Sequence, residues 1–457
     1  VPGEYFEARE RALLGTRYDV LYAASCAVRR GVTVNGLRCA PQEFAAAVDF
    51  GLEPSPFCDA AFLLTDPQLR PGRHAYHHAG VFYVQEPSAS VPAGLLGVRP
   101  GERVLDLCAA PGGKTSQLAA ALRGEGLLVA NEYVAARAGV LKSNLERMGV
   151  TNALVLNEST ARVAAAFPAF FDKVLVDAPC SGEGMFRKDP DARGEWSEGN
   201  VKQCAARQDE ILREAWRALR PGGTLVYSTC TFNRDEDEGA LERMAAWAGD
   251  EIAESEETAV EDAWGIVCGR VGAFRTFRFY PHRTCGEGFF AAVARKSFDA
   301  GGRVRAPKAR RTVFAAVDRK TAGELARWVR NPGGMHFAAV ADTCYAWYAA
   351  QADAVRTLSE ALPVIYSGVA LGQVFKGVLK PDPALAFFDG MNRGALPAAE
   401  LDDEETLRFL RRQDIAAGGL AEGMNLVCSR GRALGFAKRI GARVNNLYPN
   451  SLRIIKQ

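Results

Sequence analysis

The stretch that decides the fold is D-L-C-A-A-P-G-G-K-T, residues 106–115. It continues a short apolar run, residues 103–107, that is typical of a β-strand, and a helical pattern follows it. A glycine-rich turn between a strand and a helix lets the backbone approach a ligand closely and presents free N–H groups to it. The stretch therefore predicts one βα unit of an open sheet, with a ligand at the carboxyl edge of the strands.

Strand and helix patterns alternate around this unit over residues 91–296, which is typical of a doubly wound parallel sheet. The apolar runs that we expect to form its strands are 103–107, 127–131, 153–156, 173–176, 224–227 and 289–293. One of the intervening helices is expected over residues 135–148, with Gly149 as its C-terminal cap.

Two cysteines follow the fourth and fifth of these runs: Cys180 in D-A-P-C (177–180) and Cys230 in S-T-C-T (228–231). Because the carboxyl ends of such strands meet at one crevice, both thiols are expected to face it. A thiol in that place is a candidate nucleophile. A buried structural cysteine is the alternative for either one alone, but the pair beside the glycine loop favours chemistry.

The glycine spacing excludes two phosphate-binding loops. A Walker loop needs a glycine where Cys108 stands, five positions before Gly113, and the dinucleotide pattern G-x-G-x-x-G is not matched. A nucleoside-type ligand without a pyrophosphate remains. Glu132 ends the second strand, where an acid accepts hydrogen bonds from ribose hydroxyls in such folds. S-adenosylmethionine fits, because its sulfonium favours nearby carboxylates such as Asp106 or Asp177.

The composition of the chain narrows the class of protein further. The chain has 457 residues, and no apolar run approaches the ~18 residues that a membrane span needs. Eleven cysteines without a C-x-x-C pair argue against a zinc site or a disulfide framework, so we expect no metal. The first residues lack a signal pattern, and a cytoplasmic protein is expected. Basic stretches at 295–320 and 424–457 suit a polyanion held from the flanks.

Four motifs together resemble the Sun/nucleolar-protein family of S-adenosylmethionine-dependent RNA cytosine methyltransferases. They are residues 83–90 (Y-V-Q-E-P-S-A-S), 106–115, 177–190 (D-A-P-C-S-G-E-G-M-F-R-K-D-P) and 227–231 (Y-S-T-C-T). The tail segments 435–439 (G-F-A-K-R) and 446–449 (N-L-Y-P) are similar to those of bacterial F-type small-subunit rRNA enzymes.

The resemblance implies an α/β fold: a Rossmann-like, seven-stranded class I methyltransferase sheet with smaller domains on both sides. We expect an α+β RNA-binding domain over residues 1–90 and the methyltransferase domain over 91–296. A basic linker (297–311), a first C-terminal α+β domain (312–375) and a PUA-like RNA-binding domain (376–457) follow.

The implied reaction is methylation of carbon 5 of a cytosine in the decoding region of 16S rRNA. Carbon 5 is a poor nucleophile until a thiolate adds to carbon 6, which is covalent catalysis. Spacing alone does not decide which thiol attacks. The resemblance assigns Cys230 as the nucleophile and Cys180 as the residue that assists product release. Lys114 and the pair Arg187-Lys188 are candidate positive neighbours that could lower a thiol pKa.

The cofactor residues carried over from the family are Cys108, Ala109, Ala110, Pro111, Gly112, Gly113, Lys114, Glu132, Ser159 and Asp177. One departure from the family pattern lies after the third strand, where many relatives carry an aspartate near the adenine. This chain has Asn157-Glu158-Ser159 there. By its spacing to Asp177, Ser159 aligns best, and Glu158 is the alternative.

The expected partner is 16S rRNA or the small ribosomal subunit, bound by a monomer that does not associate with membranes. A tRNA-directed enzyme and a non-catalytic ribosome-assembly factor are the two alternatives. Segments 182–184 and 187–190 are expected at the RNA entrance. Gln208 is expected to begin a helix and either to face the site or to cap and pack, and His77 and His78 are expected on the surface or facing RNA.

Overall fold

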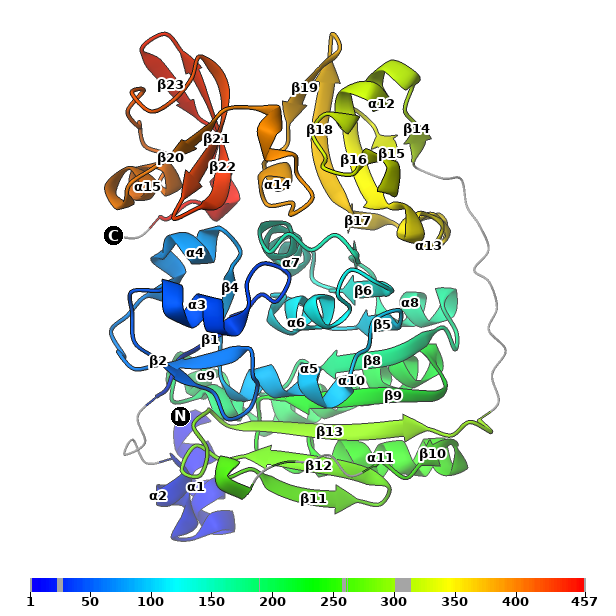
Figure 1. The fold of residues 1–457 in the computed structure, drawn as a ribbon. Coiled ribbons are helices and arrows are strands. Elements are labelled where there is room, and N and C mark those ends of the chain that lie inside the picture. The colour runs from blue at the N-terminus through cyan, green and yellow to red at the C-terminus, as the bar shows by residue number, and fades with distance from the viewer. Residues whose placement is uncertain are drawn as a thin grey trace.

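The computed structural model describes residues 2–22, 28–188, 190–256, 260, 262–300 and 314–455. Within these residues the chain forms four sheets, of which the largest has ten strands (Figure 1). Seven of its strands run in the order β12-β13-β9-β8-β5-β6-β7. Their bounds are β5 (Arg103–Asp106), β6 (Leu127–Asn131), β7 (Ala153–Leu156), β8 (Phe171–Asp177), β9 (Leu219–Thr229), β12 (Phe274–Phe279) and β13 (Phe289–Lys296).

Strands β5 to β9 pair in parallel, whereas β13 is antiparallel to both β9 and β12. This order and these directions confirm the expected methyltransferase sheet. Three short strands extend it: β10 (Ile252–Ala253), β11 (Val267–Val271) and β17 (Val364–Ser367). Sequence analysis missed β12, because its arginines interrupt the apolar run although Phe274, Phe277 and Phe279 are buried.

Helices cover both faces of this sheet, since alternate strand residues point to opposite sides. Leu105 packs with α8 (Thr160–Ala166), α10 (Glu198–Ala218) and α11 (Glu238–Ala248). Its neighbour Val104 packs with α5 (Val91–Leu96), α6 (Gly113–Ala121) and α7 (Ala135–Arg147). Gly149 follows α7 with φ +68°, as a C-terminal cap requires. No helix in the described ranges is both long and apolar enough to cross a membrane.

The N-terminal region places an antiparallel sheet, in the order β2-β3-β1-β4, beside the central layer (Figure 1). Its elements are β1 (Gly31–Val34), α3 (Pro41–Ala47), β2 (Leu52–Pro54), β3 (Ala61–Leu64), α4 (Ala75–His78) and β4 (Phe82–Gln85). Helices α1 (Pro2–Leu14) and α2 (Arg17–Tyr22) pack elsewhere, and Phe6 of α1 contacts Trp196 at the end of α9 (Pro190–Glu195). Strand β4 lies beside the glycine loop that follows β5, since Tyr83 of β4 is next to Gly113.

Two further sheets follow the central one. The first has the order β14-β15-β16-β18-β19 and is built from β14 (Ala315–Ala316), β15 (Met335–Val340), β16 (Thr343–Tyr348), β18 (Val369–Phe375) and β19 (Val378–Pro381). Helices α12 (Arg319–Ala326), α13 (Ala349–Ala361) and α14 (Pro383–Ala386) accompany it. The boundary expected at residue 375 falls within the β18–β19 hairpin, so this sheet continues to Pro381. Most of the expected linker, residues 301–311, lies outside the described residues.

The last sheet packs against the N-terminal one, and we call this contact the junction. It contains β20 (Ala398–Glu400), β21 (Gly423–Ser429), β22 (Arg432–Ile440) and β23 (Arg443–Asn446), with α15 (Asp403–Leu410) beside them. Phe44 and Phe82 of the N-terminal region share one hydrophobic core with Phe409 and Tyr448. Figure 1 shows the two regions one above the other, although they lie at opposite ends of the sequence.

The two histidines of α4 lie at this junction, so the expectation of surface or RNA-facing residues is wrong for His78. Its side chain is buried, and its Nδ1 lies 2.8 Å from the hydroxyl of Tyr448. Burial lowers the pKa of both His77 and His78, that of His78 to about 4. Single-sequence reasoning missed this, because the partner residue lies 370 positions away.

Candidate active site

The two thiols of interest lie side by side at one end of the central sheet. Cys180 follows β8 and Cys230 follows β9, and these parallel strands pair Asp177 with Ser228. Cys180 lies three residues beyond Asp177 and Cys230 two residues beyond Ser228, so the two cysteines leave the sheet at the same edge. Their Sγ atoms are 3.3 Å apart, and the N–H of Cys230 lies 3.4 Å from Sγ of Cys180.

Cys230 also lines a cavity of about 330 Å³. The cavity runs between the glycine loop after β5, the ends of β8 and β4, and the start of β13. Its walls are Tyr83–Glu86, Ala89, Asp106, Cys108–Pro111, Gly113, Lys114, Asp177, Ala178, Met185, Cys230, Gly288 and Phe289. The structure thus brings Cys230 and Asp177 together with most of the expected cofactor loop.

The glycine loop has the shape that close approach to a ligand requires. Gly112 adopts φ +111°, where a residue with a Cβ is strained. A Cβ on Gly113 would lie 3.0 Å from the ring of Tyr83, so the backbone and this aromatic side chain already touch. The loop leads directly into α6, whose first residues, Gly113 and Lys114, line the same cavity.

Asp106 supplies a carboxylate oxygen that has no partner within the described protein. Its Oδ2 accepts a hydrogen bond from Thr115 (2.7 Å), whereas Oδ1 is buried and unpartnered. Burial raises the pKa of Asp106 to about 7. An orphaned carboxylate oxygen on the wall of this cavity fits a cationic or N–H-bearing ligand, as the amino and sulfonium groups of S-adenosylmethionine are.

Asp177 joins the cofactor loop to the thiol side of the cavity. Its Oδ2 accepts a hydrogen bond from Nζ of Lys114 at 2.8 Å, and its Oδ1 accepts one from the hydroxyl of Ser228 at 2.7 Å. Lys114 is therefore paired with a carboxylate rather than with a thiol. The ion pair fixes the lysine across the mouth of the glycine loop.

Two of the expected site cysteines, Cys180 and Cys108, have a raised pKa. The hydrogen bond to Cys230, together with burial, raises the pKa of Cys180 well above its usual range, so this thiol stays protonated at neutral pH. Burial and the charge of Asp106 also raise the pKa of Cys108. Only a thiolate attacks carbon, whereas these surroundings favour the protonated thiol at both positions.

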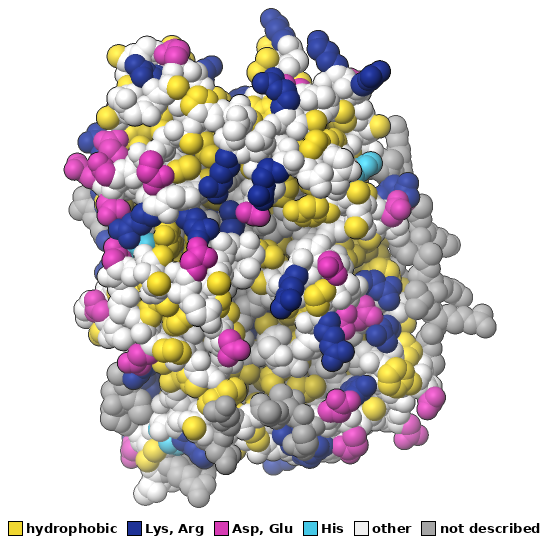
Figure 2. Space-filling view, in the orientation of Figure 1, with side chains coloured by type: hydrophobic (Ala, Val, Ile, Leu, Met, Phe, Trp, Pro, Cys, Tyr) yellow, Lys and Arg dark blue, Asp and Glu magenta, His cyan; other side chains and the backbone are white. Residues whose placement is uncertain are grey.

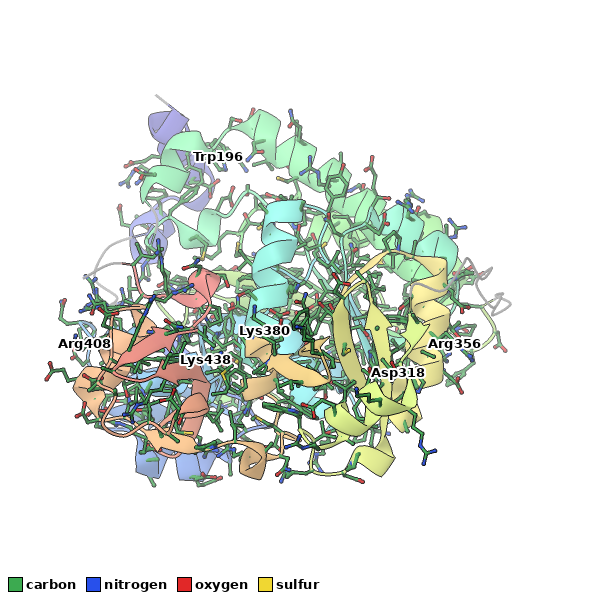
Figure 3. The ribbon with its side chains drawn as sticks, turned by 90° about the horizontal axis from the view of Figure 1, so that it is seen from above. Trp196, Asp318, Arg356, Lys380, Arg408 and Lys438 are labelled. Atoms are coloured by element: carbon green, nitrogen blue, oxygen red, sulfur yellow. The ribbon has the colours of Figure 1, made fainter. Side chains whose placement is uncertain are left out.

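Two buried glutamates near the thiols were not among the expected site residues. Glu183, which is 1% exposed, accepts hydrogen bonds from the indole of Trp196 (2.9 Å), the hydroxyl of Thr231 (2.9 Å) and the N–H of Phe232 (3.2 Å). The expectation that segment 182–184 lines an RNA entrance is therefore wrong for Glu183. In Figure 3, Trp196 lies beside the N-terminal helices. Asp189 of segment 187–190 lies outside the described residues.

Glu236 is the second buried glutamate, and it involves Gln208. Gln208 lies in the middle of α10 rather than at its start, and it is fully buried. Its Nε2 donates to the carbonyl of Pro179 (3.0 Å) and to Glu236 (2.8 Å). Of the roles expected for Gln208, the structure therefore shows packing and hydrogen bonding behind the site. Nothing in the spacing of Glu236 indicated this contact.

Four expected site residues are not on the cavity wall: Gly112, Glu132, Ser159 and Cys180. Glu132 accepts a hydrogen bond from the N–H of Val134 (2.9 Å) and lies 3.8 Å from Arg137. Ser159 caps α8 by accepting from the N–H of Arg162 at 3.3 Å, and Glu158 pairs with the Arg162 side chain at 2.6 Å. Their contacts to ribose and adenine stay predictions.

A sheet of this order, with a glycine loop at β5 and a cavity at its carboxyl edge, defines a class I S-adenosylmethionine-dependent methyltransferase. Solved structures support this class. A methyltransferase homologue from Pyrococcus horikoshii is 29% identical, with a TM-score of 0.51 over 64% of this chain and 99% of that one. NSun6 from the same organism has the same fold, with 19% identity and a TM-score of 0.54 over 64% and 97%.

Sequence comparisons identify a narrower family within this class. The family model for the 16S rRNA methyltransferase RsmB/F matches residues 93–295. The models for the N-terminal domain and the PUA domain of RsmF match residues 2–87 and 397–454. Ribosomal RNA small subunit methyltransferase F of Escherichia coli K12 is 34% identical over 95% of this chain and 92% of its own. The Serratia proteamaculans protein of that name is 40% identical over 61% and 59%. The chain belongs to this family of rRNA methyltransferases.

Proposed function

We propose that this protein transfers a methyl group to carbon 5 of a cytosine in 16S rRNA through a transient bond between Cys230 and the pyrimidine. The observation that carries the proposal is the position of the Cys230 sulfur. It lines the same cavity as the glycine loop and lies 3.3 Å from a second thiol. The names of the relatives support the rRNA substrate.

S-adenosylmethionine, when bound, supplies an electrophilic methyl group that an activated carbon 5 can accept. Activation is the work of Cys230: its thiolate adds to carbon 6 and moves electron density to carbon 5. After methylation, a base takes the proton from carbon 5, the double bond between carbons 5 and 6 re-forms, and the bond between carbon 6 and sulfur breaks to return the Cys230 thiolate. The step is covalent catalysis by a cysteine. Lys114, held by Asp177, and the unpartnered oxygen of Asp106 are placed to bind the donor.

Cys180 has a role that its protonation supports. The hydrogen bond to Cys230 and burial raise the pKa of Cys180 and so favour its protonated form in the free enzyme. A thiol at 3.3 Å can donate a hydrogen bond to the departing thiolate and so favour its release. This agrees with a division of labour in which Cys230 attacks and Cys180 assists release.

RNA would be held from both flanks of the catalytic domain. Figure 2 shows Lys and Arg side chains gathered where the C-terminal sheets meet the layers below them. Burial lowers the pKa of Arg38 to about 10, and the charges around it are those of Asp389, which opposes the shift, and of Arg393 and Arg432. Contacts between basic side chains and RNA phosphates can offset the few kcal/mol needed to take a cytosine out of its stack. We expect the reaction in the cytoplasm, where this RNA is made.

Bisulfite sequencing of RNA tests the proposal and its alternatives. Purified protein and the methyl donor would be incubated with small subunits, with 16S rRNA and with tRNA, each made without the modification. A new protected cytosine in rRNA supports the proposal. Protection in tRNA alone would move the substrate to tRNA. Protection in neither would favour a non-catalytic assembly factor and contradict the proposal.

A further inference from the structure

Glu236 is a buried carboxylate that contacts both loops carrying the thiols. It lies in the segment N-R-D-E, residues 233–236, just beyond Cys230, and it is 0% exposed. Its Oε2 accepts hydrogen bonds from the N–H of Ser181 (3.0 Å) and from Nε2 of Gln208 (2.8 Å). Its Oε1 accepts one from Nδ2 of Asn233 at 2.6 Å.

These donors belong to three separate segments. Ser181 directly follows Cys180, and Asn233 lies on the loop that carries Cys230. Gln208 also holds the carbonyl of Pro179, the residue before Cys180. Glu236 therefore restrains the peptide on both sides of Cys180 and ties it to the neighbouring loop. A hydrogen bond between the hydroxyls of Ser181 and Thr231 (2.9 Å) runs parallel to this connection.

We propose that Glu236 is a positioning residue: its carboxylate holds the Cys180 loop against the Cys230 loop and so keeps the two sulfur atoms in contact. The role for catalysis rests on the proposed function, because the two thiols must cooperate only if Cys230 bonds to the pyrimidine. The geometric part of the proposal is independent of any RNA.

A carboxylate is suited to this place for a chemical reason. It accepts hydrogen bonds at both oxygens and donates none, which matches a ring of N–H donors. A glutamine in its place offers one oxygen and an NH₂ group that faces other donors, so at least one buried N–H would lose its acceptor.

The next residue along the chain provides a matched control. Asp237 is equally buried, but its contacts stay on the Cys230 side of the site. It accepts a hydrogen bond from the hydroxyl of Thr229 (2.6 Å) and pairs with Arg278 at 3.1 Å. Asp237→Asn thus replaces a buried carboxyl group at the same depth without cutting the connection to Cys180.

The test measures how fast the two thiols form a disulfide in the full-length protein. Diamide takes up the two thiol hydrogens as the sulfur–sulfur bond forms, and peptide mapping counts the Cys180–Cys230 cross-link. Wild type, Glu236→Gln and Asp237→Asn are compared well below their unfolding temperatures. We expect Glu236→Gln to slow cross-linking about tenfold, as the loss of a buried acceptor predicts. Asp237→Asn should stay within about twofold of wild type, because it acts at a separate contact.

Cross-linking of Glu236→Gln at the wild-type rate would overturn the proposal, and so would equal slowing in both variants. If Glu236→Gln does not fold, Gln208→Leu replaces it, since this change removes the Pro179 contact and leaves the carboxylate in place. We expect Gln208→Leu to slow cross-linking about threefold, and an unchanged rate would contradict the proposal. A wild-type protein that transfers no methyl group to RNA would refute the proposed function while leaving this measurement valid.

Discussion

The thiol edge and the junction bring distant residues together in different ways. We use thiol edge for segments 177–183 and 228–236. There, buried carboxylates such as Glu183 and Glu236 each receive three or more hydrogen bonds. The junction instead joins two apolar faces, and its buried polar contact is a histidine that burial holds neutral against Tyr448. Strand order places the first set of residues, whereas packing alone places the second.

If the thiol edge is the catalytic region, Cys230→Ala has the largest effect of any single change. Without the nucleophile, carbon 5 of cytosine is not activated, and we expect methyl transfer to fall by about 10⁴-fold or more. Incorporation of labelled methyl into rRNA measures the loss. Cys268→Ala, at an exposed cysteine of β11, is the matched control and should keep full activity. Comparable activity of Cys230→Ala and wild type would contradict the assignment of catalysis to the thiol edge.

The junction is expected to respond to pH through His78. Burial lowers its folded-state pKa to about 4, below the usual value near 6.5, so the unfolded chain binds the proton first as pH falls. This contribution to stability is complete above pH 6.5 and is lost progressively toward pH 4. Between pH 7.5 and 5, His78→Gln should therefore lose about 2 kcal/mol less of its free energy of unfolding than wild type. Urea titrations at both pH values measure the difference, and equal losses would contradict a neutral, buried His78.

The glycine loop offers a smaller effect, on donor binding rather than on turnover. Gly112 has φ +111°, and a Cβ there would also lie 3.1 Å from Leu141. We expect Gly112→Ala to weaken binding of S-adenosylmethionine about tenfold, since the strained backbone costs on the order of 1–3 kcal/mol. Titration calorimetry measures the affinity. Gly139→Ala, on α7 with open space around it, should bind like wild type; a similar loss there would show that the loop conformation is not the cause.

Much of the thiol edge could be predicted from sequence, because an open parallel sheet collects its strand ends at one side. Cys180, Cys230 and the glycine loop each follow an apolar run, and that sufficed to expect them together. Glu236 and Gln208 could not be found in this way. They contact the thiol loops through backbone groups, the N–H of Ser181 and the carbonyl of Pro179, which side-chain patterns do not mark.

The elements of the fold also divide into those that the sequence predicts and those that it does not. Strands with uninterrupted apolar runs, such as β5 and β8, were expected correctly, whereas β12 was missed because arginines alternate with its buried phenylalanines. The joining of β17 to β7 and the shared core of the junction depend on faces that meet only after the chain has folded. A single sequence carries no signal for such long-range packing.

The smallest effect is expected from the ion pairs that surround the junction. Glu43 lies 2.6 Å from Arg432, but its side chain is 58% exposed. Exposed pairs contribute at most about 1 kcal/mol, so Glu43→Gln should change the free energy of unfolding by less than that. Phe409→Ala, which opens the shared core, should cost about 3–5 kcal/mol in the same urea titration. A larger loss for Glu43→Gln than for Phe409→Ala would mean that charge, not packing, holds the two regions together.

The most direct test of the central claim is to trap the bond between protein and RNA. If Cys180 assists release, Cys180→Ala should accumulate a covalent complex with 16S rRNA in the presence of S-adenosylmethionine. Digestion and mass spectrometry should then find a cytidine attached to the peptide that carries Cys230, and the Cys180→Ala/Cys230→Ala variant should form no such complex. A complex that survives in the double variant, or one attached at another residue, would contradict the account.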